Sequence, residues 1–407
     1  MYNNNIMLQN QGGKALKKLF PYLKRFIAET DKLLLALITA ASVFGVLMVH
    51  STTRCLLEDG QVMSRDAVVM LAAAAIGIVI TLIISALDYE FIMKLWPIIG
   101  IGCIGLMIIT LFFGVAPDSR PDAKSWLDFG FVFFQPSELV KIGYVITFSM
   151  HLELCRDTIN QIKSLILLGI HAMIPIGLVI LTGDMGSALV FMFMTLAMLY
   201  FAGLHWGFFA CGGALIVASS PLIWMYVLND FQKARFLALM RPEEFAAESY
   251  QQLKGLNALG SGGFFGQGLF KGTYTQNGIV PESENDMIFT AVGEETGFVG
   301  CIIALTILFM ICFKMFSIGK KSRDFSSQIA CYGIAAMIAT QVIINIGVCL
   351  MLLPVIGITL PFFSAGGSST LCLYVGVGLV FSIARFNRSR QAVNFRVSRI
   401  STPFSEF

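Results

Sequence analysis

The sequence predicts an all-α integral membrane protein of about ten transmembrane helices, with one long extracytoplasmic loop between the seventh and eighth. Of its 407 residues, 56% are hydrophobic and 13% are charged, whereas soluble domains carry about 25% charged residues. The apolar runs are continuous rather than alternating, which favours helices over the strands of a barrel. The net charge of +3 is small and does not suggest a nucleic acid partner.

Ten segments approach the roughly 20 apolar residues that a helix needs to cross the hydrocarbon core. The first follows a polar segment, and the fourth is the weakest because it contains Glu138 and Lys141. The last two share the uncharged stretch 325–384, which Pro354 and Pro361 divide. The segments are 33–53, 67–87, 95–116, 136–152, 164–182, 185–203, 206–228, 286–316, 327–352 and 367–385.

The distribution of Lys and Arg predicts the orientation. An even number of spans places both termini on one side, and that side collects eighteen Lys and Arg residues against nine on the other. The termini are therefore expected in the cytoplasm. A tail of residues 1–32 and a basic tail of residues 386–407 then flank a membrane domain of residues 33–385, whose loop at about 229–285 faces outward.

Three charged residues lie in or between the middle spans. Glu138 and Lys141 are three residues apart on one helix face and can pair. Such a pair either only fixes helix packing, or it holds a cavity open or orients another charged group. Asp184 lies in a short outward turn, where it either caps the next helix or contributes to an outward-facing site.

The long loop is rich in glycine and contains scattered cations. Gly262 and Gly263 belong to a run at 260–268, which is either a flexible loop or a place where the backbone approaches a ligand closely. Arg235 and Lys254 either bind a diphosphate by charge or are simply solvated. The run is not a Walker or dinucleotide-binding loop, so no nucleotide is expected. Scattered histidines and cysteines form no metal motif.

Asp286 stands where this polar stretch enters the eighth span. It is either a cap, favourable by up to about 1 kcal/mol at a helix N-terminus, or a general base at the membrane surface. Further along, the prolines and glycines at 353–369 predict non-helical backbone that is buried in protein or lines a wet cavity. Ser368 lies at its end, where backbone N–H groups opening the tenth span offer an anion site.

In their order and spacing, from about residue 33 to 385, these segments resemble the SEDS family (shape, elongation, division and sporulation), which includes RodA, FtsW and SpoVE. Departures such as Asn285 before the aspartate leave the branch open, with a lean toward the elongation type, which is RodA-like. The matching pieces are Trp126 with Gln135–Glu138 and Lys141, Gly183–Gly186, Arg235–Pro242, Tyr250–Gln251 with Gly260–Gly268, Pro281–Asp286, Glu294–Gly297, and Asn345 with Pro354–Ser369.

The resemblance implies a peptidoglycan glycosyltransferase that polymerises lipid II at the outer face of the bacterial cytoplasmic membrane, in cell elongation, division or sporulation. It implies that Asp286 is catalytic and that a class B penicillin-binding protein, a transpeptidase, is the partner. An inverting reaction is expected, in which Arg235 or a divalent cation (Mg²⁺ or Mn²⁺) helps the diphosphate to leave. The alternatives are a lipid II flippase or other transporter, and a scaffold that only recruits a transpeptidase.

Overall fold

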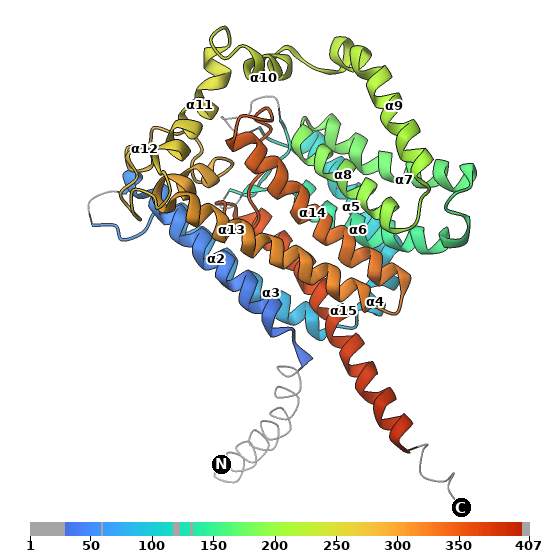
Figure 1. Cartoon of the computed structure of the whole chain (residues 1–407). Coiled ribbons are helices and arrows are strands. Elements are labelled where there is room, and N and C mark those ends of the chain that lie inside the picture. The colour runs from blue at the N-terminus through green and yellow to red at the C-terminus, as the bar shows by residue number, and fades with distance from the viewer. Residues whose placement is uncertain (1–28, 58–59, 117–122, 131–132, 401–407) are drawn as a thin grey trace, which may run out of the picture.

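The computed structural model describes the backbone at residues 29–57, 60–116, 123–130 and 133–400, and the side chains as far as Arg388. Each of the ten predicted segments corresponds to a long helix (Figure 1). These helices are α2 (Lys32–Thr52), α3 (Arg65–Ala86), α5 (Trp96–Phe113), α6 (Pro136–Leu154), α7 (Ile162–Leu181), α8 (Met185–Phe201), α9 (Trp206–Leu222), α13 (Ile288–Lys320), α14 (Phe325–Cys349) and α15 (Gly367–Ile400).

Eight of these helices are long and apolar enough to cross a membrane. The helix α8 is apolar but shorter, with 17 residues, and α6 carries Glu138 and Lys141 among its apolar positions. Within the described residues, the strands are limited to the two-residue antiparallel pair β1 (Leu127–Asp128) and β2 (Phe133–Phe134). The predicted class, an all-α multi-pass membrane protein, is confirmed.

Several helix starts follow directly from the local sequence. Asp31, Ser64 and Asp184 each accept a hydrogen bond from a backbone N–H three residues later, and so cap α2, α3 and α8. Pro136 occupies the first position of α6, where its missing N–H costs nothing. Of the alternatives for Asp184, capping is therefore part of its role.

The bundle has two different ends, which we call the terminal face and the loop face. The helix α2 begins and α15 ends at the terminal face, whereas α10–α12 gather at the loop face (Figure 1). The predicted loop at 229–285 is thus largely helical. The short elements are η1 (Arg54–Leu56), α4 (Tyr89–Lys94), η2 (Arg156–Thr158), the π-helical turn η3 (Ile223–Val227), α10 (Asp230–Met240), α11 (Ala246–Ser261) and α12 (Thr273–Gln276).

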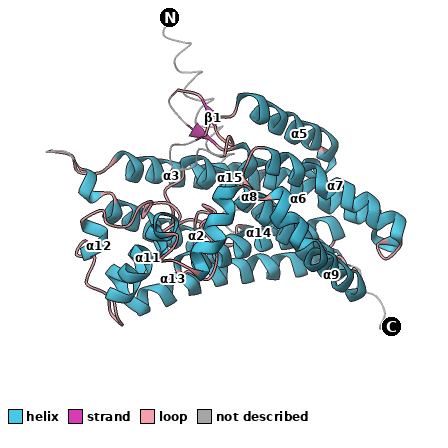
Figure 2. Ribbon diagram, turned by 90° about the horizontal axis from the view of Figure 1, so that it is seen from above, coloured by secondary structure: helices cyan, strands magenta, loops and turns pink. Residues whose placement is uncertain are grey.

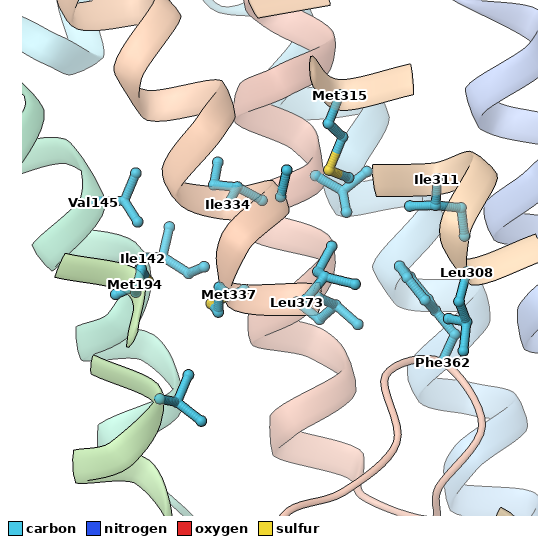
Figure 3. Close-up of a cluster of buried hydrophobic side chains, with 14 of the residues drawn as sticks. Ile142, Val145, Met194, Leu308, Ile311, Met315, Ile334, Met337, Phe362 and Leu373 are labelled. Carbon is cyan, nitrogen blue, oxygen red and sulfur yellow. The ribbon is translucent and has the colours of Figure 1, made fainter. Parts of the chain in front are cut away.

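Buried apolar side chains from α6, α8, α13, α14 and α15 meet in the centre of the bundle (Figure 3). Glycines let some backbones approach closely. A Cβ at Gly77 of α3 would lie 2.2 Å from the ring of Tyr374 on α15, and one at Gly45 of α2 would lie 2.2 Å from the carbonyl oxygen of Phe362. The helix α9 differs, because none of its residues is buried; it lies at the edge of the bundle (Figures 1 and 2).

Two long helices differ from the predicted spans. The helix α13 was expected to be continuous, but Gly297 has φ 69° and ψ −168°, which breaks it. The helix α15 continues beyond the predicted span to Ile400, so much of the expected basic tail extends the last helix. Residues 1–28 and 401–407 of the two tails lie outside the described residues.

The segment at 350–366, which joins α14 to α15, is non-helical, as its prolines and glycines predict. We call it the connecting segment. Its Val355, Ile358 and Leu360 are buried among the helices. The backbone carbonyls of such a segment need partners inside the protein, because hydrocarbon supplies none. Those partners define the site described next.

Candidate active site

Asp286 lies in the turn that precedes α13 and is 8% exposed. Its Oδ1 accepts a hydrogen bond from Nε2 of Gln251 on α11, at 3.1 Å. The same amide nitrogen of Gln251 also donates to the carbonyl of Pro281, at 3.3 Å. The N-cap position of α13 is Met287, and no side chain caps that helix. Asp286 is therefore not the N-cap residue, although its charge lies one residue before that position, and its carboxylate is oriented by α11.

The backbone of this turn is held by α14 and by the connecting segment. Asn345 of α14 donates to the carbonyl oxygens of Asp286 and Ile358, both at 2.8 Å, and is fully buried. Ser364 donates to the carbonyl of Asn285 at 2.6 Å. One buried amide thus joins the candidate base directly to the connecting segment.

The glycine-rich run packs against the broken turn of α13. A Cβ at Gly262 would lie 1.9 Å from the carbonyl oxygen of Gly293. The N–H of Phe298 donates to the carbonyl of Gly263 at 3.0 Å, and Gly263 has φ +55°. The close approach predicted from the glycines therefore exists, but the partner is another backbone of the same chain.

Two buried carboxylates of α13 hold the next part of the loop. Glu294 accepts hydrogen bonds from the backbone N–H groups of Tyr274 and Thr275, at 2.7 and 2.9 Å. Glu295 accepts from the hydroxyl of Ser51 at 2.7 Å and from the N–H of Phe270 at 3.1 Å. Both acids therefore attach the loop to the first turns of α13, before the break at Gly297.

Glu138 and Lys141 form the predicted ion pair, with Oε1 and Nζ 2.8 Å apart. Lys141 is fully buried and Glu138 is 8% exposed. Glu138 also lines a cavity of about 10 Å³ together with Thr359 and Ser364 of the connecting segment. That volume is about enough for one water molecule. The pair is thus buried, and it also borders the segment that holds Asp286.

Asp184 bridges α8 to the start of α6. Besides capping α8, it accepts hydrogen bonds from Nε2 of Gln135 at 2.7 Å and from the hydroxyl of Ser137 at 3.1 Å. The backbone N–H of Gln135 in turn donates to the hydroxyl of Ser368 at 3.4 Å. Asp184 and Ser368 therefore position the loop-face ends of α6, α8 and α15 around the connecting segment.

Arg235 of α10 reaches the connecting segment from the loop face. Its Nη1 donates to the carbonyl of Val355 at 2.8 Å, and its guanidinium lies 4.3 Å from the ring centroid of Phe231. It lines a cavity of about 260 Å³ between α7, α8, α10 and the connecting segment. A neighbouring cavity of about 310 Å³ shares Gln232 with it and contains Lys124. Both cavities carry positive charge at their loop-face rim.

Most predicted site residues converge on the connecting segment, and three do not. Lys254 stands on α11 with its ammonium 5.5 Å from the ring centroid of Tyr250, and Gly262 and Gly263 belong to the contact with α13. The sequence predicts no role for Gln251 or Asn345, although both hold Asp286 in the structure.

One further acid, Glu284, lies two residues before Asp286, and burial raises its pKa above the ordinary value of 4.5. Nearby Glu282 and Asp66 act in the same direction. Within the described residues, no group of three or more His, Cys, Asp or Glu is placed to hold a metal ion. A divalent cation prefers six or more oxygen ligands, so these side chains alone do not form a cage for one.

The chain matches known proteins over most of its length. The sequence profile of the FtsW/RodA/SpoVE family, described as cell cycle proteins, matches residues 31–389. The peptidoglycan glycosyltransferase MrdB of Escherichia coli K12 is 28% identical over 356 residues, which cover 87% of this chain and 93% of that protein. The probable peptidoglycan glycosyltransferase FtsW of Trichlorobacter lovleyi is 29% identical over 366 residues, which cover 88% and 94%.

Solved structures share the fold. The rod shape determining protein RodA of Thermus thermophilus matches with a TM-score of 0.63 at 24% identity, over 88% of this chain and 97% of that chain. A chain from a structure described as the structural coordination of polymerization and crosslinking by a peptidoglycan synthase complex matches with a TM-score of 0.73. It is also 24% identical, over 88% of this chain and 98% of that chain. The arrangement of helices described above is therefore a known membrane architecture.

Proposed function

This chain belongs to the FtsW/RodA/SpoVE family of peptidoglycan glycosyltransferases, and we propose that Asp286 is the base with which it lengthens glycan strands from lipid II. The enzyme serves cell-wall synthesis in cell shape or division. The observation that carries the proposal is the placement of Asp286, a carboxylate at the loop face that is oriented by Gln251 and anchored through its backbone by Asn345. Such fixed geometry suits a group that must meet one reacting proton.

The reaction proceeds as an inverting displacement. The hydroxyl oxygen of the acceptor sugar forms a bond to the anomeric carbon of the donor, on the face opposite the diphosphate. The bond from that carbon to the diphosphate oxygen breaks, and its electron pair leaves with the lipid diphosphate. Asp286 takes the hydroxyl proton as the bond forms. The donor arrives already activated, so no nucleotide takes part.

The diphosphate is expected to lie near Arg235. Arg235 binds the carbonyl of Val355, and Asn345 joins Asp286 to the carbonyl of Ile358, only three residues further along. Arg235 and Asp286 are therefore both linked by hydrogen bonds to one buried segment, Arg235 directly and Asp286 through Asn345. A cation fixed in this way stabilises the negative charge that grows on the leaving group. A divalent cation would add the same stabilisation, held mainly by the diphosphate oxygens.

The surroundings of Arg235 favour a substrate that stays attached to the bilayer. The cavity that it lines has apolar walls from Ile176, Leu189 and Met192 below the charged rim. The helix α9, which precedes α10 in the chain, has no buried residue, so the bundle does not close around it. A lipid tether can therefore remain in the membrane while the diphosphate and sugar occupy the loop face.

This chemistry requires that the loop face is the outer face of the cytoplasmic membrane. The excess of Lys and Arg on the terminal face supports that orientation. We also propose a class B penicillin-binding protein as the partner. The support is the similarity to a chain of a peptidoglycan synthase complex that coordinates polymerization with crosslinking.

The test supplies purified protein with labelled lipid II and Mg²⁺ or Mn²⁺, with and without the transpeptidase partner. Wild type is expected to produce glycan polymer on a gel, and Asp286→Asn is expected to produce none while remaining folded. If neither protein polymerises with the partner present, but both move lipid II across vesicle membranes, the glycosyltransferase proposal is wrong and a flippase is indicated.

A further inference from the structure

A long groove lies on the lipid-facing side of the bundle, away from the site described above. It has a volume of about 430 Å³ and runs between α5 and α7, with α6 as its floor. The α5 wall extends from Trp96 to Met107, and the α7 wall from Leu167 to Leu178. Only Met107 and Thr110 of α5 are buried, so this helix faces the bilayer for most of its length.

The polar side chains that line the groove already have partners inside the protein. The hydroxyl of Tyr144 shares a hydrogen bond with Thr195 at 2.6 Å. The ring nitrogens of His171 bond to His151 at 2.9 Å and to the hydroxyl of Thr147 at 3.2 Å. The other residues of the walls are mostly aliphatic. A ligand would therefore gain little from hydrogen bonds here, and the groove suits a hydrocarbon chain.

The length of the groove matches one leaflet of a membrane. Eleven residues separate Leu167 from Leu178, a rise of about 16 Å at 1.5 Å per residue. Half of the hydrocarbon core is about 15 Å. An acyl chain of one leaflet, running parallel to α5 and α7, would therefore extend along the whole groove.

Positive charge flanks the end of the groove that is nearer the terminal face. Lys94 ends α4 two residues before Trp96, and Lys163 lies in the first turn of α7; both residues are exposed. Lys and Arg near a membrane surface attract anionic headgroups. Trp96 lines the groove at the same end, and tryptophan favours the interface between headgroups and acyl chains.

From these observations we propose that the groove between α5 and α7 binds one acyl chain of an anionic phospholipid, with its headgroup beside Lys94 and Lys163. The lipid belongs to the leaflet on the terminal face. This site is separate from the one proposed for lipid II, because it lies on other helices and has no charged residue along its walls. Its occupation does not depend on the proposed role of Asp286.

The test uses substitutions that fill the groove and measures how much lipid the protein retains. A Cβ at Gly100 meets only the methyl of Thr147, at 3.4 Å, so Gly100→Leu occupies the groove with little strain. The matched control is Gly102→Leu on the same helix, where a Cβ meets nothing within 4 Å and which does not line the groove. Ile104→Trp, at a side chain that is 38% exposed, fills the groove independently should Gly100→Leu fail to fold.

Native mass spectrometry of protein reconstituted with phosphatidylglycerol and phosphatidylcholine gives the result. Wild type and Gly102→Leu are expected to retain one phosphatidylglycerol, while either groove-filling variant lowers its occupancy by at least tenfold. Lys94→Gln with Lys163→Gln should abolish the preference over phosphatidylcholine. The proposal is overturned if groove-filling variants keep the lipid, if no lipid is retained by any protein, or if added polyprenyl phosphate displaces it from the groove.

Discussion

The bridge that Asn345 makes between Asp286 and the connecting segment allows a quantitative prediction. Asn345→Leu keeps the branched shape of the side chain but removes both donors, which leaves the carbonyls of Asp286 and Ile358 buried without this partner. At about 1–3 kcal/mol for each unsatisfied buried acceptor, the free energy of unfolding should fall by about 2–6 kcal/mol. Because the turn that carries Asp286 loses its anchor, kcat for glycan polymerisation should fall by about 100-fold.

Gln252 provides a matched control. Its Nε2 donates to the carbonyls of Val348 and Leu353, both at 2.8 Å, so it makes two bonds of the same kind to the same end of α14 without touching Asp286. Gln252→Met should therefore destabilise by a similar amount, measured by denaturant titration in mixed micelles, but should lower kcat far less. Equal losses of kcat in the two variants at equal stability would refute the positioning role of Asn345.

Three further predictions concern the surroundings of the site. Gly262→Ala places a Cβ 1.9 Å from the carbonyl oxygen of Gly293 and should lower the free energy of unfolding by about 1–3 kcal/mol. Gly260→Ala, where a Cβ meets nothing within 4 Å, should not destabilise the protein. Equal melting temperatures of the two variants would contradict the packing described. Lys141→Met leaves Glu138 buried without its cation and should lower the free energy of unfolding by about 3–5 kcal/mol. The double variant Lys141→Met/Glu138→Leu should recover most of that loss. No recovery in the double variant would argue against a purely electrostatic cost. Because burial raises the pKa of Glu284 above 4.5, the folded state binds that proton more tightly than the unfolded chain. The stability of wild type should therefore decline relative to Glu284→Gln as the pH rises above that value, and melting curves that run parallel from pH 4 to 8 would exclude this.

Much of the fold follows from local patterns in the sequence. Continuous apolar runs locate the long helices, and residues such as Ser64 and Pro136 mark where they begin. The break at Gly297 could not be predicted in this way, because it accompanies a tertiary contact. The N–H of Phe298, next to the break, donates to the carbonyl of Gly263, which is 34 residues before Gly297 in the chain. A glycine in an apolar run is equally compatible with a continuous helix, so the tertiary contact decides the conformation.

The sequence predicts the charged residues of the candidate site, but it does not predict the roles of its amide side chains. Asp286, Glu138 and Lys141 stand out because charge in or beside a span is expensive. Gln251 and Asn345 carry no such signal, since neutral amides are ordinary in both loops and helices. Their roles arise only when α11 and α14 come together around Asp286, across separations of 35 and 59 residues.

The central claim is that Asp286 removes a proton from the acceptor sugar, and a single-turnover assay tests it most directly. Asp286→Asn should bind labelled lipid II with an affinity close to that of wild type, since the amide keeps the size of the side chain. Its rate of glycosidic bond formation, with the transpeptidase partner present, should fall by about 10²–10⁴-fold. Polymerisation by Asp286→Asn at the wild-type rate would contradict the account.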